Sequence, residues 1–213
     1  MKSAAVLLAS FLAAPVPAQA PGASPPAATP TPGPIAIDRA ETRTGGKLTV
    51  RSPAFADGAP IPSRYSRNGG NVSPPLSWHG GRARTAAYAL IVDDPDGRIK
   101  PVTHWTAWNV RATALPEGLP DGSQVGLTPP SDRPASVFAQ GTTTMHTVGY
   151  AGPRPPAGDP PHHYHFQVFA LDSSLGLQPG ATREALLAAM RGHVLAEGET
   201  VGLFTQTAPP AKP

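Results

Sequence analysis

A loop rich in proline and glycine, followed directly by a strand-like run, constrains this chain more than any other stretch. The loop spans Gly149–Pro161 and cannot be helical, because proline lacks an N–H donor and restricts the residue before it to extended angles. The run that follows, His162–Asp172, is rich in aromatic and β-branched residues and predicts a strand. Alternation along that strand gives two faces, one with His162, Tyr164, Phe166 and Val168, the other with His163, His165, Gln167 and Phe169. A rigid loop therefore presents an imidazole beside a phenol.

The length and composition predict one mostly β domain. A chain of 213 residues can bury a sizeable core as a single all-β domain. It contains 29 prolines and 22 glycines, and only 15% of its residues are charged, against about 25% in typical domains. Such a composition predicts many turns and few long helices.

Hydrophobic patterns place the other elements. Strands are predicted at Lys47–Ser52, Ala86–Val92, Thr103–Val110 and Thr200–Thr207, and Leu115–Pro134 reads as loop. The run Ala86–Val92 is almost continuously apolar, which favours a central strand buried on both faces. In Thr103–Val110, alternation assigns His104, Thr106 and Trp108 to one face and Trp105 and Ala107 to the other.

One helix is predicted near the carboxyl end. Thr182 can cap it, Glu184 suits its positive amino-terminal end, and one face carries Leu186, Leu187, Met190 and Val194. We expect this helix to pack on the edge of the sheet and to carry no chemistry.

The amino-terminal region has the features of a secretory signal. Residues 1–20 combine a basic Lys2, a short apolar run and the small-residue site Ala18-Gln19-Ala20. The run is shorter than the roughly 20 residues that a transmembrane helix needs, and no later stretch qualifies, so no transmembrane anchor is expected. Residues 21–46 are expected to form a Pro/Ala-rich tether and lead-in, 47–207 the folded domain, which could begin as early as Ile35, and 208–213 a tail. The predicted location is the periplasm or the external medium.

Charge and cysteine content narrow the function classes. The formal net charge is +3, but the basic residues are scattered without interleaved aromatics, which argues against a nucleic-acid partner. The absence of cysteine rules out disulfides and thiol nucleophiles. There is no Gly-x-Ser-x-Gly elbow or local Ser/His/Asp signature, so no catalytic residues are assigned, and no cofactor is expected.

Two further features could carry chemistry. The turn Asp94-Pro95-Asp96 closes one predicted strand and His104 opens the next, so carboxylates and an imidazole could meet at one end of the sheet. The turn lacks the ligand series of a calcium loop. The pair His163-x-His165 has the spacing of a sheet-borne zinc site, but a third ligand would have to come from His146 or His193, and no metal site is predicted.

These motifs together resemble the phosphatidylethanolamine-binding protein family, in its bacterial branch similar to Raf-kinase inhibitors. The resemblance covers about Lys47–Thr207 and rests on an ordered set of motifs: Gly70-Asn71-x-Ser73-Pro74-Pro75-Leu76-x-Trp78, Asp94-Pro95-Asp96, His104-Trp105, Gly149-Tyr150-x-Gly152-Pro153-x-Pro155-Pro156-x-Gly158 and His162-His163-Tyr164. The predicted helix is part of it, near Gly192–Glu197. The resemblance implies an antiparallel β-sandwich with peripheral helices and a small pocket for phosphate-bearing headgroups.

By motif position, the resemblance also assigns the pocket residues. Asp94 and Asp96 correspond to its carboxylates, His104 and His162 to its histidines, Tyr164 to its tyrosine, and Pro155 and Pro156 to its rim. The chain departs from the usual pattern at Gly97-Arg98 and at Thr142–Thr144, and Ser66 and Arg154 stand where bacterial members often have cysteine.

The resulting expectation is an exported protein that binds a small phosphate-bearing anion or lipid headgroup and that could inhibit or modulate a protein partner. The alternative from another class is a hydrolase or metal-assisted enzyme that uses the cluster His162, His163 and His165.

Overall fold

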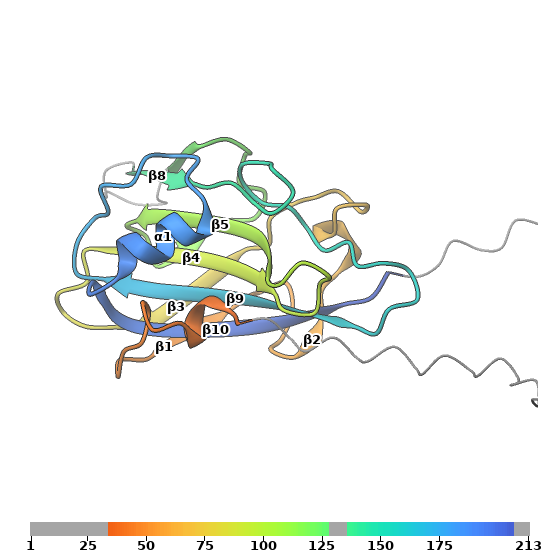
Figure 1. Cartoon of the computed structure of the whole chain (residues 1–213), viewed down its shortest axis with the longest axis horizontal. Coiled ribbons are helices and arrows are strands. Elements are labelled where there is room, and N and C mark those ends of the chain that lie inside the picture. Colours follow the sequence, from red (N-terminus) through yellow and green to blue (C-terminus); the bar gives the residue numbers. More distant parts are fainter. Residues whose placement is uncertain (1–33, 128–135, 207–213) are drawn as a thin grey trace, which may run out of the picture.

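The computed structural model describes residues 34–127 and 136–206 and is mostly β (Figure 1). Its elements, in chain order, are η1 (Ala36–Asp38), β1 (Leu48–Arg51), β2 (Ala59–Pro60), η2 (Ser63–Tyr65), β3 (Leu76–Gly80), β4 (Ala87–Asp94), β5 (Val102–Val110), β6 (Ala114–Leu115), β7 (Gln124–Leu127), β8 (Ser136–Gln140), β9 (His162–Leu171), α1 (Arg183–Met190) and β10 (Val194–Phe204). The predicted signal segment 1–20, residues 21–33 of the tether and the tail 208–213 lie outside the described residues. The described part contains no helix that could span a bilayer.

The strands form two sheets. The larger has seven strands in the order β2-β10-β9-β4-β5-β8-β7, and the smaller has three in the order β1-β3-β6. The long central strands β10, β9, β4 and β5 pair antiparallel, while the short β2 joins β10 in parallel. The antiparallel β-sandwich predicted from the sequence is therefore confirmed.

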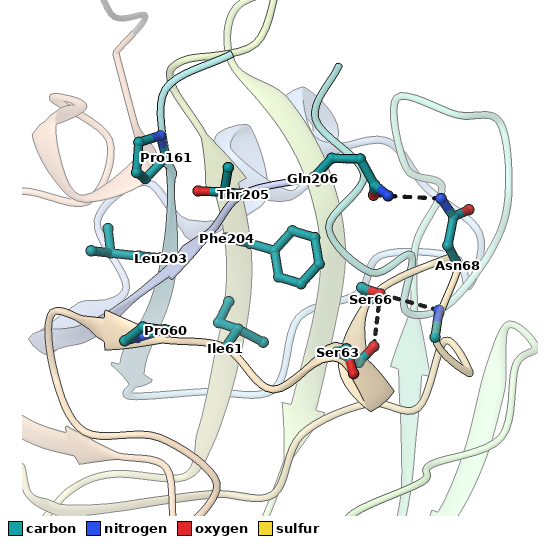
Figure 2. A pocket seen from close by; sticks show the side chains of 11 residues that line it. Pro60, Ile61, Ser63, Ser66, Asn68, Pro161, Leu203, Phe204, Thr205 and Gln206 are labelled. Carbon is teal, nitrogen blue, oxygen red and sulfur yellow. Dashed lines mark hydrogen bonds between the residues drawn. The ribbon is translucent and has the colours of Figure 1, made fainter. Parts of the chain in front are cut away.

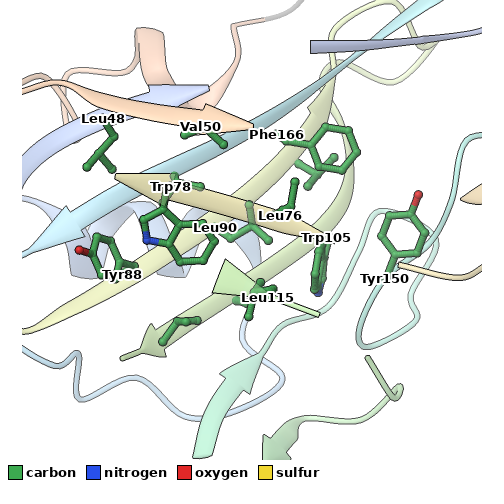
Figure 3. Close-up of a cluster of buried hydrophobic side chains, with 14 of the residues drawn as sticks. Leu48, Val50, Leu76, Trp78, Tyr88, Leu90, Trp105, Leu115, Tyr150 and Phe166 are labelled. Carbon is green, nitrogen blue, oxygen red and sulfur yellow. The ribbon is translucent and has the colours of Figure 1, made fainter. Parts of the chain in front are cut away.

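The inner face of the large sheet packs against the small sheet. Alternate residues of β4 and β9, including Leu90, Val92, Phe166 and Val168, join β1 and β3 side chains in one buried cluster (Figure 3). Trp78 packs edge-to-face on Tyr88 there, with ring centroids 5.4 Å apart. The strand β4 is buried at every position, as the apolar run predicted, because a layer covers each of its faces.

The helix α1 covers the outer face. Thr182 caps it by accepting a hydrogen bond from the Ala185 N–H at 3.3 Å. Leu186, Leu187 and Met190 pack on a second cluster that includes Ile91 of the central strand β4. The helix is peripheral to the sandwich, as predicted, but it lies across the middle of the sheet rather than at its edge (Figure 1).

The carboxyl end of this helix differs from the prediction. The helix ends at Met190 because Gly192 adopts a left-handed conformation (φ 80°), a common helix terminator. Val194, which the helical pattern included, and the rest of the Gly192–Glu197 region lead into β10, so this strand begins six residues before the predicted Thr200. In the segment predicted as loop, β6 and β7 add two short strands.

The face assignment for β5 was wrong for His104. Val92 pairs with Trp105 and Asp93 with Thr103, so His104 is an extra residue, a β-bulge. A second irregularity lies near Asn109, which has φ 62°. Trp105 and Ala107 pack in the inner cluster and Trp108 in the outer one, as predicted, whereas the His104 ring packs on Tyr164 of the inner cluster and so lies on the side of Trp105.

The lead-in before β1 packs on the outer face of the sheet. The backbone N–H of Ala36 donates to Asp93 Oδ2 at 3.0 Å, and that of Ile37 donates to Gln167 Oε1 at 2.6 Å. The side chains of Ile35 and Ala36 are buried. Residues 34–38 are thus held by polar groups that line the back of the strands carrying the candidate site.

Candidate ligand pocket at the end of β4 and the start of β9

Three neighbouring strands each bring a polar side chain to one buried cluster. Because β4 runs antiparallel to β5 and β9, its end lies beside the start of both neighbours. Asp94 ends β4, His104 lies near the start of β5, and His162 begins β9. These three residues are only 3–5% exposed, and Tyr164 beside them is 1% exposed. The structure therefore brings together four of the residues that the sequence predicted for a site.

Asp94 is the centre of the cluster. Its Oδ2 accepts a hydrogen bond from His162 Nδ1 at 2.8 Å and lies 4.0 Å from His104 Nε2. Its Oδ1 accepts from the backbone N–H groups of Asp96 at 2.8 Å and Gly97 at 3.2 Å. Asp94 Oδ1 thus closes the turn after β4, and this holds Oδ2 toward the two imidazoles.

Hydrogen bonds determine the tautomers of both histidines. His104 Nδ1 lies 2.6 Å from the Ala151 carbonyl oxygen, which can only accept, so Nδ1 carries the proton. His162 Nδ1 donates to the Asp94 carboxylate in the same way. In its neutral form each ring therefore has an unprotonated Nε2, and protonation turns that atom into a donor.

Burial favours the neutral form of His104. Desolvation lowers its pKa, although the hydrogen bond to the Ala151 carbonyl and the charge of Asp94 oppose that effect. A bound anion would add a favourable charge and would raise the same pKa. Binding of an anion at this site would therefore be linked to uptake of a proton.

Tyr164 supplies a donor without a partner. Its ring packs edge-to-face on His104, with centroids 5.0 Å apart, and stacks on His162 at 6.5 Å. Its hydroxyl oxygen is buried and has no hydrogen-bond partner among the residues that the structure describes. Burial, with the nearby Asp94 carboxylate, raises the pKa of Tyr164 strongly, so the phenol stays protonated. A buried hydroxyl of this kind can donate to a ligand oxygen.

The rim carries two further carboxylates. Asp96 Oδ2 accepts from both the backbone N–H and Nδ1 of His163, each at 2.8 Å. Burial acts to raise the pKa of Asp96, but these hydrogen bonds outweigh it and lower the pKa. Asp159 was not predicted, yet its Oδ2 lies 3.7 Å from His162 Nε2. Of the two predicted rim prolines, Pro155 is buried and Pro156 is exposed.

Asn71 connects the first motif to the loop that precedes β9. Its Oδ1 accepts from the Gly152 N–H at 2.8 Å, and its Nδ2 donates to the Tyr150 carbonyl at 3.3 Å. The adjacent Ala151 carbonyl is the group that orients His104. Asn71 thereby fixes the loop on which the tautomer of a pocket histidine depends, although the sequence analysis gave it no role in the site.

Comparison with known proteins agrees with this fold and these motifs. The family model described as phosphatidylethanolamine-binding protein matches residues 51–205. The chain belongs to this family.

Relatives of this family member are found in archaea and bacteria. It is 42% identical over 160 residues to the UPF0098 protein PH1269 of Pyrococcus horikoshii, covering 74% of this chain and 77% of that one. It is 43% identical to a UPF0098 protein of Methanothermobacter thermautotrophicus, covering 74% and 98%.

Two solved structures of the family are similar as well. The phosphatidylethanolamine-binding protein homologue CT736 of Chlamydia trachomatis has a TM-score of 0.62 and 34% identity, covering 75% of this chain and 98% of that one. The E. coli protein YbcL, described as a member of the mammalian family, has a TM-score of 0.64 and 25% identity, covering 76% and 99%.

The three histidines at the start of β9 do not share a common partner. His162 pairs with Asp94 and His163 with Asp96, while His165 Nδ1 bonds Glu199 Oε2 at 3.0 Å. Within residues 34–127 and 136–206, no three His, Asp or Glu side chains are grouped to hold a metal ion. In the described residues, these histidines therefore do not form the shared metal site that the alternative of a metal-assisted enzyme requires.

A Ser/His/Asp grouping at the end of β9 lacks the geometry of a catalytic triad. Ser173 Oγ lies 3.1 Å and Asp172 Oδ1 2.8 Å from the same atom, His193 Nδ1. A catalytic triad needs the serine and the carboxylate on different ring nitrogens, so that one side accepts a proton while the other holds the ring. This grouping is a surface ion pair.

Proposed function

We propose that this protein binds a small phosphate-bearing ligand of the phosphatidylethanolamine headgroup type in the pocket of Asp94, His104, His162 and Tyr164. The observation that carries the proposal is the buried Tyr164 hydroxyl without a partner, beside two imidazoles that share one carboxylate. Phosphate oxygens accept hydrogen bonds from a phenol and from protonated Nε2 atoms, and charge assistance shortens and strengthens such bonds. The pocket thus offers donors to a ligand, and the Tyr164 hydroxyl forms no hydrogen bond to the residues that the structure describes.

The carboxylates favour a ligand that also carries a positive charge. Asp94, Asp96 and Asp159 lie on or near His162 and His163. Together they disfavour a doubly charged anion, while a rim carboxylate can accept hydrogen bonds from an ammonium group. A zwitterionic phosphodiester satisfies both sets of groups, and a lipid headgroup and its free, deacylated form share that chemistry.

We place this activity outside the cytoplasm, in the periplasm or the external medium. The support is the signal-like segment 1–20, whose apolar run is too short to span a bilayer. A role as inhibitor or modulator of a protein partner would be exerted in the same compartment.

The test is a calorimetric titration with sn-glycero-3-phosphoethanolamine, a deacylated phosphodiester, and with 1-acyl-lysophosphatidylethanolamine below its micelle concentration. We expect saturable binding that tightens as the pH falls, because the bound anion favours protonated imidazole. His104→Ala and His162→Ala should each lose most of the affinity. Binding of both compounds leaves a lipid source open, whereas binding of the deacylated compound alone identifies a free metabolite.

The matched control is His193→Ala. His193 is also paired with a carboxylate, but it lies beyond the opposite end of β9, next to Asp172. This variant should bind as wild type does. Unchanged affinity in folded His104→Ala and His162→Ala would contradict the pocket assignment.

A further inference from the structure

A groove lies beside the candidate pocket, between the segment 60–69 and the end of β10 (Figure 2). Its volume is about 480 Å³, within the roughly 300–1,000 Å³ of small-molecule sites. One part is apolar and consists of Pro60, Ile61, Pro161, Leu203 and Phe204. The other part is polar and includes Ser63, Ser66, Asn68 and Gln206.

Two residues that line the groove are neighbours of His162. Pro161, which lines the groove, immediately precedes it in the chain. Phe204, at the centre of the groove in Figure 2, is paired with His162 across β10 and β9. Directly paired residues in an antiparallel ladder project to the same face of the sheet, so the Phe204 ring and the His162 imidazole lie on one side.

The walls of the groove are held in place by the protein. Ser66 Oγ donates to the Ser63 carbonyl at 2.7 Å and accepts from the Gly69 N–H at 3.1 Å, which closes the turn on the polar side. On the apolar side, a Cβ at Gly202 would lie 2.4 Å from Ile61 Cγ1, so glycine is what lets Ile61 approach β10. Hydrogen bonds and close packing therefore hold both walls of the groove.

We propose that this groove receives the alkyl chain of a single-chain phospholipid whose headgroup occupies the pocket. The inference rests on the proposed function, because it takes the headgroup site as the starting point of the chain. Pro161 and Phe204 of the apolar part are the neighbours of His162 in the chain and in the sheet, so a chain attached to a phosphodiester bound at His162 could enter the groove beside them. The amides of Asn68 and Gln206, which bond each other at 3.4 Å, mark the polar limit of the groove.

Chain length is the variable that tests the proposal. The probes are n-alkyl esters of phosphorylethanolamine, from methyl to octyl, titrated below their micelle concentrations. Each methylene that enters an apolar site is worth about 0.8 kcal/mol, so affinity should rise about fourfold per methylene until the groove is filled. A plateau at longer chains marks its length.

Leu203→Asn and Pro60→Ser locate the chain. Leu203 is half-buried and Pro60 is exposed, so the second variant keeps the test usable if the first does not fold. Both should flatten the dependence on chain length and leave the affinity for the methyl ester unchanged. The matched control is Val201→Asn, two residues away on the same face of β10 and outside the groove, which should keep the wild-type dependence.

The outcomes separate this inference from the proposed function. Failure of the methyl ester to bind overturns the proposed function and the inference with it. Binding of the methyl ester with no gain from longer chains overturns the inference alone. If Leu203→Asn and Pro60→Ser show the same rise in affinity with chain length as Val201→Asn, the alkyl chain lies elsewhere. That result also overturns the inference.

Discussion

Asp93 and Asp94 are consecutive at the end of β4, and their carboxylates bind groups on opposite faces of the large sheet. Asp94 Oδ2 accepts from His162 in the candidate pocket, whereas Asp93 Oδ2 accepts from Arg183 Nη2 of α1 at 2.9 Å. Thr103 Oγ1 also donates to Asp93, at 3.2 Å, next to the bulge that carries His104. One face of the strand end is thus anchored by a buried ion pair while the other face presents the site.

Removing Arg183 should destabilise the whole domain. Arg183→Met leaves Asp93, which is fully buried, without its cation, and breaking a buried pair costs about 3–5 kcal/mol of unfolding free energy. Urea denaturation followed by tryptophan fluorescence measures the change. The same substitution at Arg191, whose partner Glu41 it meets at the surface, should cost less than about 1 kcal/mol. Equal midpoints for the two variants would contradict a stabilising role for the Asp93 network.

Asp94→Asn should impair binding and leave the fold intact. The amide oxygen can still accept from the Asp96 and Gly97 N–H groups, so the turn can close. The amide no longer supplies a charge to His162 Nδ1, and hydrogen bonds to charged groups are worth about 1.5–3 kcal/mol. We expect the affinity for sn-glycero-3-phosphoethanolamine to fall about ten- to a hundredfold by calorimetry. Wild-type affinity in this variant would show that the carboxylate does not orient the imidazole.

Much of the fold follows from local patterns in the sequence. The apolar run of β4 and the aromatic and β-branched residues of β9 predicted both strands, because such residues pack well on the buried faces of a sheet. The helix was predicted through its cap, Thr182, but its end was not, since Val194 continues the helical spacing although Gly192 has already ended the helix. The strand β7 was missed because it has only four residues in a stretch rich in turn residues.

Several features of the candidate site cannot be predicted from such local patterns. His162 and Tyr164 could be paired by strand parity, whereas the bulge at His104 leaves no trace in the sequence, because it depends on the register with β4. The Ala151 carbonyl that orients His104 is a backbone group, and every residue carries one. Asp159 looked like an ordinary turn residue in a proline-rich loop, and only the folded loop brings it to His162.

Stability should fall as the pH drops below the ordinary histidine pKa. Burial lowers the pKa of His104 below its usual 6.5, so between 6.5 and that lowered value the unfolded chain binds a proton that the folded chain does not. The contribution of His104 is therefore fully present above pH 6.5 and is lost as the pH falls. Urea midpoints of wild type and His104→Gln, compared at pH 7.5 and 5.5, isolate it. A difference between the two proteins that does not change with pH would argue against a neutral, buried His104.

Asp159→Asn should tighten anion binding. The Asp159 carboxylate lies 3.7 Å from His162 Nε2, the atom that we assign to a phosphate oxygen, so it competes with an anion for the same proton. Removing its charge at a partly exposed position should raise the affinity for inorganic phosphate about two- to tenfold, as expected for a charge pair at a surface dielectric. Asp38→Asn changes the net charge equally from an exposed position in η1, whose Ala36 N–H binds Asp93 on the other face of the sheet, and should have little effect. An unchanged or weaker affinity for phosphate in Asp159→Asn would contradict this competition.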